Sequence, residues 1–270
     1  MKLHRFSQHL RRSALALLIS ASSAQAHDTW FEALSGNANP GGLHLLALAT
    51  GNQFPKQEFA VAANVLVRQG CVDAGGRSRA LQPQLQLPTR LLLRTAVAGA
   101  MSCWAQLTPF DIELAADKLA VYFDEIRPSP AVLAAWAALQ ARGLPWRERY
   151  TKYARIELPG SGPPALPAPL ALGLDLQLLA DANQLQAGST VGFQLWRDGQ
   201  ALAGLWLELR GAEGEPSLWG QTDGAGQLRL TLPKAGAWVL RGTELRLAAD
   251  DATRWDSRFI TLAFQVQAKP

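Results

Sequence analysis

The stretch that decides the fold class is residues 191–209, VGFQLWRDGQALAGLWLEL. Apolar side chains alternate with polar or small ones in its first five residues, and Leu205, Leu207 and Leu209 repeat the spacing of two in its last five. A period of two places the apolar side chains on one face of a β-strand. Asp198-Gly199, between the two runs, is a strong hairpin-turn signal. The stretch therefore predicts two antiparallel strands, each with one buried face.

The same alternation continues on both sides of this hairpin. Thr222 to Gly226 forms a second turn signal, and further strands are expected near residues 174–178, 228–232, 238–240 and 260–266. Short strands separated by turns at intervals of roughly ten residues are typical of a β-sandwich.

Residues 27–158 give a more mixed pattern. Ser129-Pro130 reads as an N-cap followed by proline at the first helical position, and Gly143 fits a helix end. The spacing of Trp146, Tyr150 and Ala154 predicts further helical turns, so a helical segment is expected over about 117–154. Strands are expected over 43–50, 59–68, 85–94 and 101–107.

Residues 159–169, PGSGPPALPAP, form a Pro/Gly-rich linker that cannot sustain a helix or a central strand. It separates an N-terminal β-rich domain, 27–158, from a C-terminal β-sandwich domain, 170–270. The fold class predicted is mainly β, with two immunoglobulin-like β-sandwich modules and a short helical segment between them.

Composition excludes several classes of protein. The 270 residues are 48% hydrophobic and 18% charged, as in a globular protein with a sizeable core. Of the 26 Lys and Arg residues, four precede residue 27, which leaves 22 basic against 22 acidic side chains. A neutral chain without a basic stripe has no footprint for nucleic acid, so no nucleic-acid partner is expected.

The first 26 residues read as a secretory signal peptide. A basic start precedes the short apolar run Ala14–Ile19, and Ala24-Gln25-Ala26 fits a signal-peptidase site. The apolar run is too short to span a bilayer, and no other stretch is long enough, so no transmembrane segment is expected. The sequence predicts an exported, periplasmic protein.

Cys71 and Cys103 are the two cysteines of the chain. In an oxidising compartment an isolated pair most simply forms one disulfide. Thiolate metal sites usually need more cysteines at shorter spacing, so a structural disulfide is predicted.

His27 is the candidate ligand for a metal ion. Cleavage after Ala26 would make it the first residue, so its α-amine and imidazole could chelate one ion. Both groups lose a proton near neutral pH, with ordinary pKa values of about 8 and about 6.5. Amine and imidazole nitrogens suit nickel, cobalt, copper and zinc.

His44 is the other histidine after residue 26 and could complete a three-nitrogen site. The alternative is a buried histidine bonded to backbone, because His44 lies in a strand that is apolar on both faces. Asp28 could add an oxygen ligand, orient an imidazole, or satisfy backbone donors. Common catalytic motifs are missing, including G-x-S-x-G, HExxH and the phosphate-binding loop, so no enzyme is predicted.

His27-Asp28-Thr29-Trp30-Phe31-Glu32 resembles the start of a family of exported bacterial proteins of unknown function associated with nickel or cobalt uptake (NikM-like periplasmic component). The likeness recurs at residues 50–55, 149–155, 222–238 and 255–264. Some members carry a histidine in the glycine turn, where this chain has Asn52. The resemblance implies immunoglobulin-like β modules and a periplasmic role in transition-metal acquisition.

Three hypotheses follow. The first is a non-enzymatic periplasmic protein that holds one divalent ion (nickel, cobalt or copper) at His27, with His44 as the candidate further ligand, and delivers it to an inner-membrane transporter. The second is a β-sandwich binding or scaffold protein of the cell envelope without metal. The third is a copper oxidase of the histidine-brace type, for which the sequence offers little.

Overall fold

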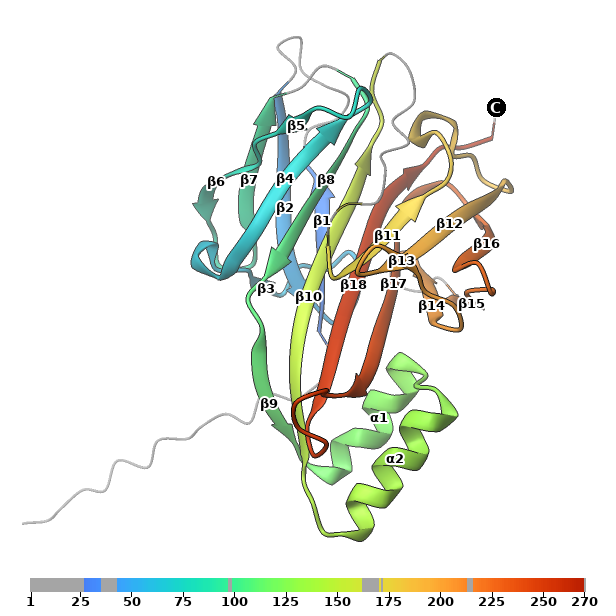
Figure 1. Ribbon diagram of the computed structural model, residues 1–270. Coiled ribbons are helices and arrows are strands. Elements are labelled where there is room, and N and C mark those ends of the chain that lie inside the picture. The colour runs from blue at the N-terminus through green and yellow to red at the C-terminus, as the bar shows by residue number, and fades with distance from the viewer. Residues whose placement is uncertain are drawn as a thin grey trace, which may run out of the picture.

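The computed structural model describes residues 27–34, 43–96, 99–161, 170, 172–212 and 216–269. These residues form a mainly β structure, as predicted, with two short α-helices at one end (Figure 1). The predicted signal peptide and most of the predicted linker, residues 162–169, lie outside the described residues. Neither helix is long and apolar enough to cross a membrane.

The strands of the described residues form three sheets of five, nine and four strands. The five-stranded sheet has the order β1-β2-β7-β6, with β3 paired to β2, and consists of β1 (Asp28–Ala33), β2 (Leu43–Gly51), β3 (Phe59–Ala60), β6 (Gln82–Gln86) and β7 (Leu91–Ala96). The four-stranded sheet consists of β11 (Leu174–Leu178), β12 (Thr190–Arg197), β13 (Gln200–Ala201) and β16 (Gln227–Thr231).

The nine-stranded sheet has the order β15-β14-β17-β18-β10-β8-β4-β5, with β9 paired to β10. Its strands are β4 (Leu66–Asp73), β5 (Ser78–Arg79), β8 (Met101–Leu107), β9 (Phe110–Leu114), β10 (Trp146–Leu158), β14 (Trp206–Arg210), β15 (Leu218–Gln221), β17 (Gly236–Leu247) and β18 (Trp255–Val266).

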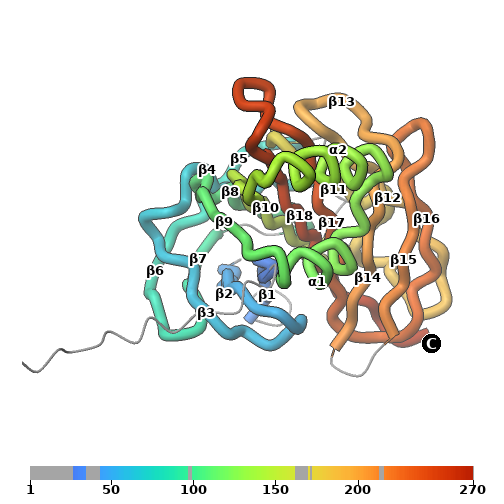
Figure 2. Tube along the Cα trace, turned by 90° about the horizontal axis from the view of Figure 1, so that it is seen from below, coloured from blue at the N-terminus to red at the C-terminus, as the bar shows by residue number. Residues whose placement is uncertain are grey.

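The nine-stranded sheet is the middle layer of the molecule, as the view along it shows (Figure 2). One core joins it to the five-stranded sheet and contains Phe31, Leu46 and Ile156. A second core joins it to the four-stranded sheet and contains Phe193, Leu262 and Phe264. Alternating side chains of the middle strands point into opposite cores, which explains why the second half of β10 is buried throughout.

β10 corrects the predicted helical segment. Residues 146–158 form a strand, so the predicted helix over 146–154 is wrong. Residues four apart share a face in a strand as well as in a helix, so the spacing of Trp146, Tyr150 and Ala154 fits both structures. Pairing decides between them, because β10 runs parallel to β18 from Glu148 to Ile156.

The helical part of the predicted segment is a hairpin of two helices, α1 (Ala116–Ile126) and α2 (Pro130–Ala141). The Ser129 side chain caps α2 by accepting from the Val132 amide at 3.4 Å, as predicted. The hairpin covers an aromatic cluster in which Trp146 stacks on Trp255, with ring centroids 4.7 Å apart.

Cys71 and Cys103 form the predicted disulfide. They face each other across the antiparallel pair β4–β8 and are both buried in the core between the five- and nine-stranded sheets. The bond closes a sequence separation of 32 residues, which corresponds to about 3–4 kcal/mol in the chain-entropy model.

Candidate functional site

The candidate site is the start of β1, where His27 precedes the first paired residue. Asp28 lies opposite Gly51 in the β1–β2 ladder, and each later residue of β1 pairs with an earlier one of β2. A Cβ at Gly51 would lie 2.7 Å from the Lys56 carbonyl and 2.9 Å from the Trp30 ring, so only glycine fits there. The ladder thereby fixes the backbone direction at His27.

The His27 side chain is half-buried and packs edge-on against Phe59, with ring centroids 5.3 Å apart. Its backbone carbonyl accepts a hydrogen bond from Lys152 Nζ at 2.6 Å. Burial lowers the pKa of the imidazole below its ordinary 6.5, and the positive charge of Lys152 lowers it further, while Glu58 and Asp28 act in the opposite direction. The imidazole is therefore mostly neutral at neutral pH, the form that binds a metal ion.

Lys152 is a buried cation at this site. Burial lowers the pKa of its ammonium group from 10.5 to about 8, against the opposing effect of Asp28. A group with that pKa changes charge just above neutral pH, directly beside the His27 backbone.

Asp28 is buried and bound to arginine. Its two oxygens accept from Arg241 Nη1 at 3.3 and 3.1 Å. Arg241 also donates to Glu208 at 2.6 Å, and Arg210 lies 2.9 Å from the same carboxylate. Burial alone raises the pKa of Glu208, but the two arginines outweigh it and hold that pKa below its ordinary value. The four side chains form one charge-balanced network.

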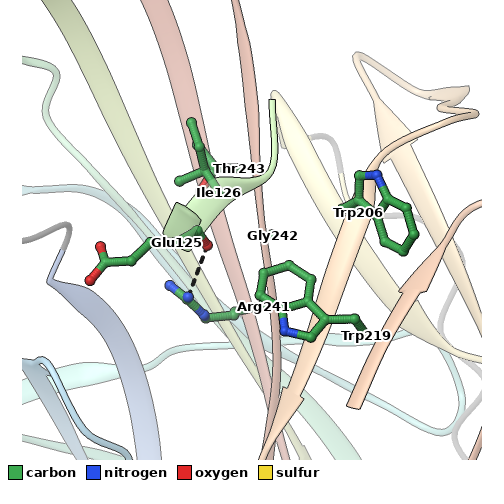
Figure 3. A pocket seen from close by; sticks show the side chains of 7 residues that line it. All are labelled: Glu125, Ile126, Trp206, Trp219, Arg241, Gly242 and Thr243. Atoms are coloured by element: carbon green, nitrogen blue, oxygen red, sulfur yellow. Dashed lines mark hydrogen bonds between the residues drawn. The ribbon is translucent and has the colours of Figure 1, made fainter. Parts of the chain in front are cut away.

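Arg241 connects this network to the helical hairpin. Its Nη2 donates to the Glu125 carbonyl at 3.0 Å, at the C-terminal end of α1 (Figure 3). Arg241 and Glu125 line a small pocket together with Trp206 and Trp219. The Arg127 guanidinium lies 3.9 Å from the centre of the Trp219 ring. The start of β1 and the end of α1 are thus held by one arginine.

His44 lies far from His27. In the β1–β2 register Ala33 pairs with Leu46, so His44 sits beyond the opposite end of β1. Along the direction of these strands, His27 and His44 are eight residues apart, which at about 3.4 Å per residue is roughly 25 Å. The structure does not bring the two imidazoles together, so they cannot share one ion. His44 is buried and faces Thr95 across the β2–β7 pair.

No cluster of three or more His, Cys, Asp or Glu side chains able to hold a metal ion occurs within the described residues. Donors at the start of β1 are therefore the nitrogens of His27 and, nearby, the carboxylate of Glu58. Glu58 accepts from the backbone and side chain of Asn52 at 3.1 and 3.2 Å. Asn52 thus orients a carboxylate whose charge acts on the imidazole.

Motif segments that are far apart in the sequence meet at this site. Trp30, from the first motif, packs on Phe54, from the glycine turn, with ring centroids 5.6 Å apart. Lys152 belongs to the segment 149–155, and Arg241 follows the segment 222–238. A family model described as a domain of unknown function (DUF4198) matches residues 24–243.

The chain belongs to the DUF4198 family. No curated protein matches the sequence. One similar solved structure, a tetra-tandem repeat in the extending region of a large adhesion protein, shares 11% identity at a TM-score of 0.24. The match covers 90% of this chain and 50% of the adhesion-protein chain, so this chain spans half the length of that structure.

The sequence analysis missed the charged residues around the DUF4198 site. Glu208 stands between Leu207 and Leu209, and Arg241 follows Leu240 in an apolar strand. A charged residue inside an alternating apolar strand is rarely buried unless it is paired. The charged residues within these apolar strands could have indicated buried ion pairs. The sequence does not show which residues pair, because the partners come from distant strands.

Proposed function

We propose that this DUF4198 protein, once residues 1–26 are removed, is a non-enzymatic periplasmic protein that binds one divalent transition-metal ion of the nickel or cobalt type. The His27 α-amine and imidazole hold the ion, with Glu58 as a neighbouring carboxylate. The observation that carries the proposal is a half-buried imidazole directly before the first residue of an anchored strand, with its pKa held below the ordinary value.

The anchoring supports a preformed chelate. The His27 carbonyl is held by Lys152, and Asp28 is held by Arg241, so neither group is left to move when an ion arrives. The amine and the imidazole are the remaining donors of the residue. A preorganised pair of donors loses less conformational entropy on binding than a mobile terminus does.

The proposal gives Asp28 and His44 roles outside the ligand set. Asp28 anchors the strand through its ion pair with Arg241. His44 is a core residue of the five-stranded sheet. A site with few protein ligands keeps open positions for incoming donors, which suits transfer of the ion to an inner-membrane transporter.

Calorimetric titration with nickel, cobalt, copper and zinc tests this function on a chain whose first residue is verified as His27. We expect His27→Ala to weaken binding at least about tenfold, since an imidazole donor is lost. A chain that keeps Ser23–Ala26 ahead of His27 should lose a similar amount, because its amine is displaced. The matched control His44→Asn should bind like the wild type.

Equal binding by all four chains would contradict the proposal, as would absence of binding by the wild type. Either result would favour the alternative, a β-sandwich binding or scaffold protein of the cell envelope without metal.

A further inference from the structure

A second candidate site lies at the opposite end of the five-stranded sheet from His27. It is a cavity of about 380 Å³ where the chain passes from β5, in the nine-stranded sheet, to β6, in the five-stranded sheet. The volume falls in the usual range for small-ligand pockets. The residues that line it include Arg79, Arg94, Gln82, Thr95, Leu43 and Ala96.

The charge of this cavity is positive. None of the described residues that line it is acidic. Arg94 forms no ion pair with any carboxylate of the described chain, and it lies directly opposite Gln82 in the β6–β7 pair. Arg79 contacts Asp73 at 3.2 Å, but Asp73 also pairs with Arg77 at 3.0 Å, so one carboxylate serves two guanidinium groups.

The donors of this cavity lie on the exposed face of β7. Arg94 and Ala96 are exposed, as is Gln82 opposite Arg94, whereas Thr95 between them is 2% exposed and lies opposite the buried His44. Side chains of consecutive residues in a strand point to opposite faces, so the Arg94 guanidinium and the Gln82 amide face the cavity side, while the Thr95 hydroxyl faces the core.

The remaining lining is apolar, with Leu43 and Ala96 from the edges of β2 and β7. Two guanidinium groups and a side-chain amide suit an oxyanion, whereas the alkyl surface suits an apolar body. We propose that this cavity binds a small organic anion with a carboxylate or phosphate head and a short apolar chain. This site is separate from the proposed metal site.

The test uses the purified full chain, with sodium hexanoate and hexyl phosphate as probes and hexan-1-ol as the uncharged comparison. Binding is followed by calorimetry and by NMR shifts of the amides of Leu43 and of Arg94–Ala96. We expect at least one of the two anions to bind at millimolar concentrations and to shift these amides. Hexan-1-ol should bind at least about tenfold more weakly, because it lacks the charged head.

Two variants probe the polar groups. Arg94→Gln should weaken binding of the anion at least about fivefold, whereas Arg142→Gln, an exposed arginine on the helical hairpin, should not. Thr95→Val, on the opposite face of β7, should leave anion binding unchanged, and weaker binding by this variant would contradict the assigned face of the cavity.

The relative affinities of hexanoate and hexyl phosphate identify the head group. Equal binding of hexan-1-ol and the anions would overturn the proposal, as would unchanged affinity in Arg94→Gln. Absence of shifts with both anions at tens of millimolar would also overturn it. Because His27 lies at the other end of the sheet, His27→Ala should leave anion binding intact, so this test is independent of the metal test.

Discussion

The buried charges at the start of β1 are an arginine and the two carboxylates that it contacts. Arg241 is 4% exposed and lies between two buried carboxylates, Asp28 and Glu208. A buried ion pair adds little net stability, yet removal of one partner leaves an uncompensated charge. Arg241 is therefore essential to the fold because its partners are already buried.

We expect Arg241→Met to lower the free energy of unfolding by about 3–5 kcal/mol, because Asp28 and Glu208 lose their shared counter-charge. Urea denaturation measures the change. Arg149→Met is the control, since the ion pair of Arg149 with Asp111 is exposed and should change the free energy of unfolding far less. Similar losses in the two variants would contradict the assigned role of Arg241.

Lys152 gives the protein a pH-dependent stability. Its pKa falls from 10.5 in the unfolded chain to about 8 in the folded protein, so between these values the unfolded chain binds more protons. Stability must then rise with pH through this window, and the cost of burying the charge is fully present below about pH 8.

We expect the free energy of unfolding to gain up to about 2 kcal/mol from Lys152 between about pH 7 and about pH 9.5. Lys152→Met should remove this gain, because a neutral side chain binds no proton in either state. Urea denaturation at both pH values checks the difference, with the exposed Lys118→Met as control. A pH dependence that is the same in wild type and Lys152→Met would contradict the prediction.

At the scale of elements, the helical hairpin is attached to the sheet through a buried carboxylate. Glu148, on β10, accepts from Tyr122 of α1 at 2.9 Å and from Trp146 Nε1 at 2.8 Å, and also from the Ser257 hydroxyl. Burial raises the pKa of Glu148, while the three donors oppose this shift. No arginine or lysine among the described residues forms an ion pair with Glu148, so the hydrogen bond from the Tyr122 hydroxyl should stabilise its carboxylate more than an ordinary surface contact would.

We expect Tyr122→Phe to cost about 1.5–3 kcal/mol, the usual range for a hydrogen bond to a charged group. Amide hydrogen exchange should become faster in α1 and α2 before it changes in β17 and β18, because the contact lies at the helix–sheet junction. The control is Tyr150→Phe, whose hydroxyl donates no hydrogen bond within the described residues. If both variants exchange alike, Glu148 does not hold the hairpin.

Sequence periodicity predicted most elements that have one buried face. The turn at Asp198-Gly199 and the Ser129 cap of α2 are both confirmed, because each is set by residues close in the chain. The strand predicted at 205–209 forms as β14 but lies in the nine-stranded sheet, so its predicted pairing with β12 is wrong and β12 pairs with β13 instead. The helix predicted over residues 146–154 was wrong because the spacing of its apolar residues fits both a helix and a strand. Only pairing with neighbouring strands selects the strand. The charges around Asp28 were missed for the same reason, since Arg241 is 213 residues away in the sequence.

At the scale of the whole molecule, the nine-stranded sheet crosses the predicted domain boundary. β10 precedes the linker and β18 follows it, yet the two strands pair in parallel over nine residues. A parallel pair between distant strands leaves no local sequence signal, so the Pro/Gly composition of residues 159–169 was the stronger clue. Residues 159–169 stand between β10, in the nine-stranded sheet, and β11, in the four-stranded sheet, and the chain then returns to the nine-stranded sheet at β14, β15, β17 and β18.

A buried network strengthens this continuity. Arg155 on β10 is 0% exposed and donates to Asp175 of β11 at 2.8 Å and to Glu157 at 2.9 Å. Its Nε also lies 2.8 Å from Ser102 Oγ on β8. The Arg155 side chain thus links β10, which precedes the linker, to β11, which follows it. Arg155 and its three partners are all buried.

We therefore expect the chain to unfold in one cooperative transition, with the calorimetric and van't Hoff enthalpies equal. Residues 170–270 expressed alone should not fold, because β18 would lose β10 and Asp175 would lose Arg155. Circular dichroism and the dispersion of NMR signals check the fragment. Two resolved heat-absorption peaks, or a folded fragment, would show that the shared sheet does not couple the two halves, because each half would then be stable without the β10–β18 pairing.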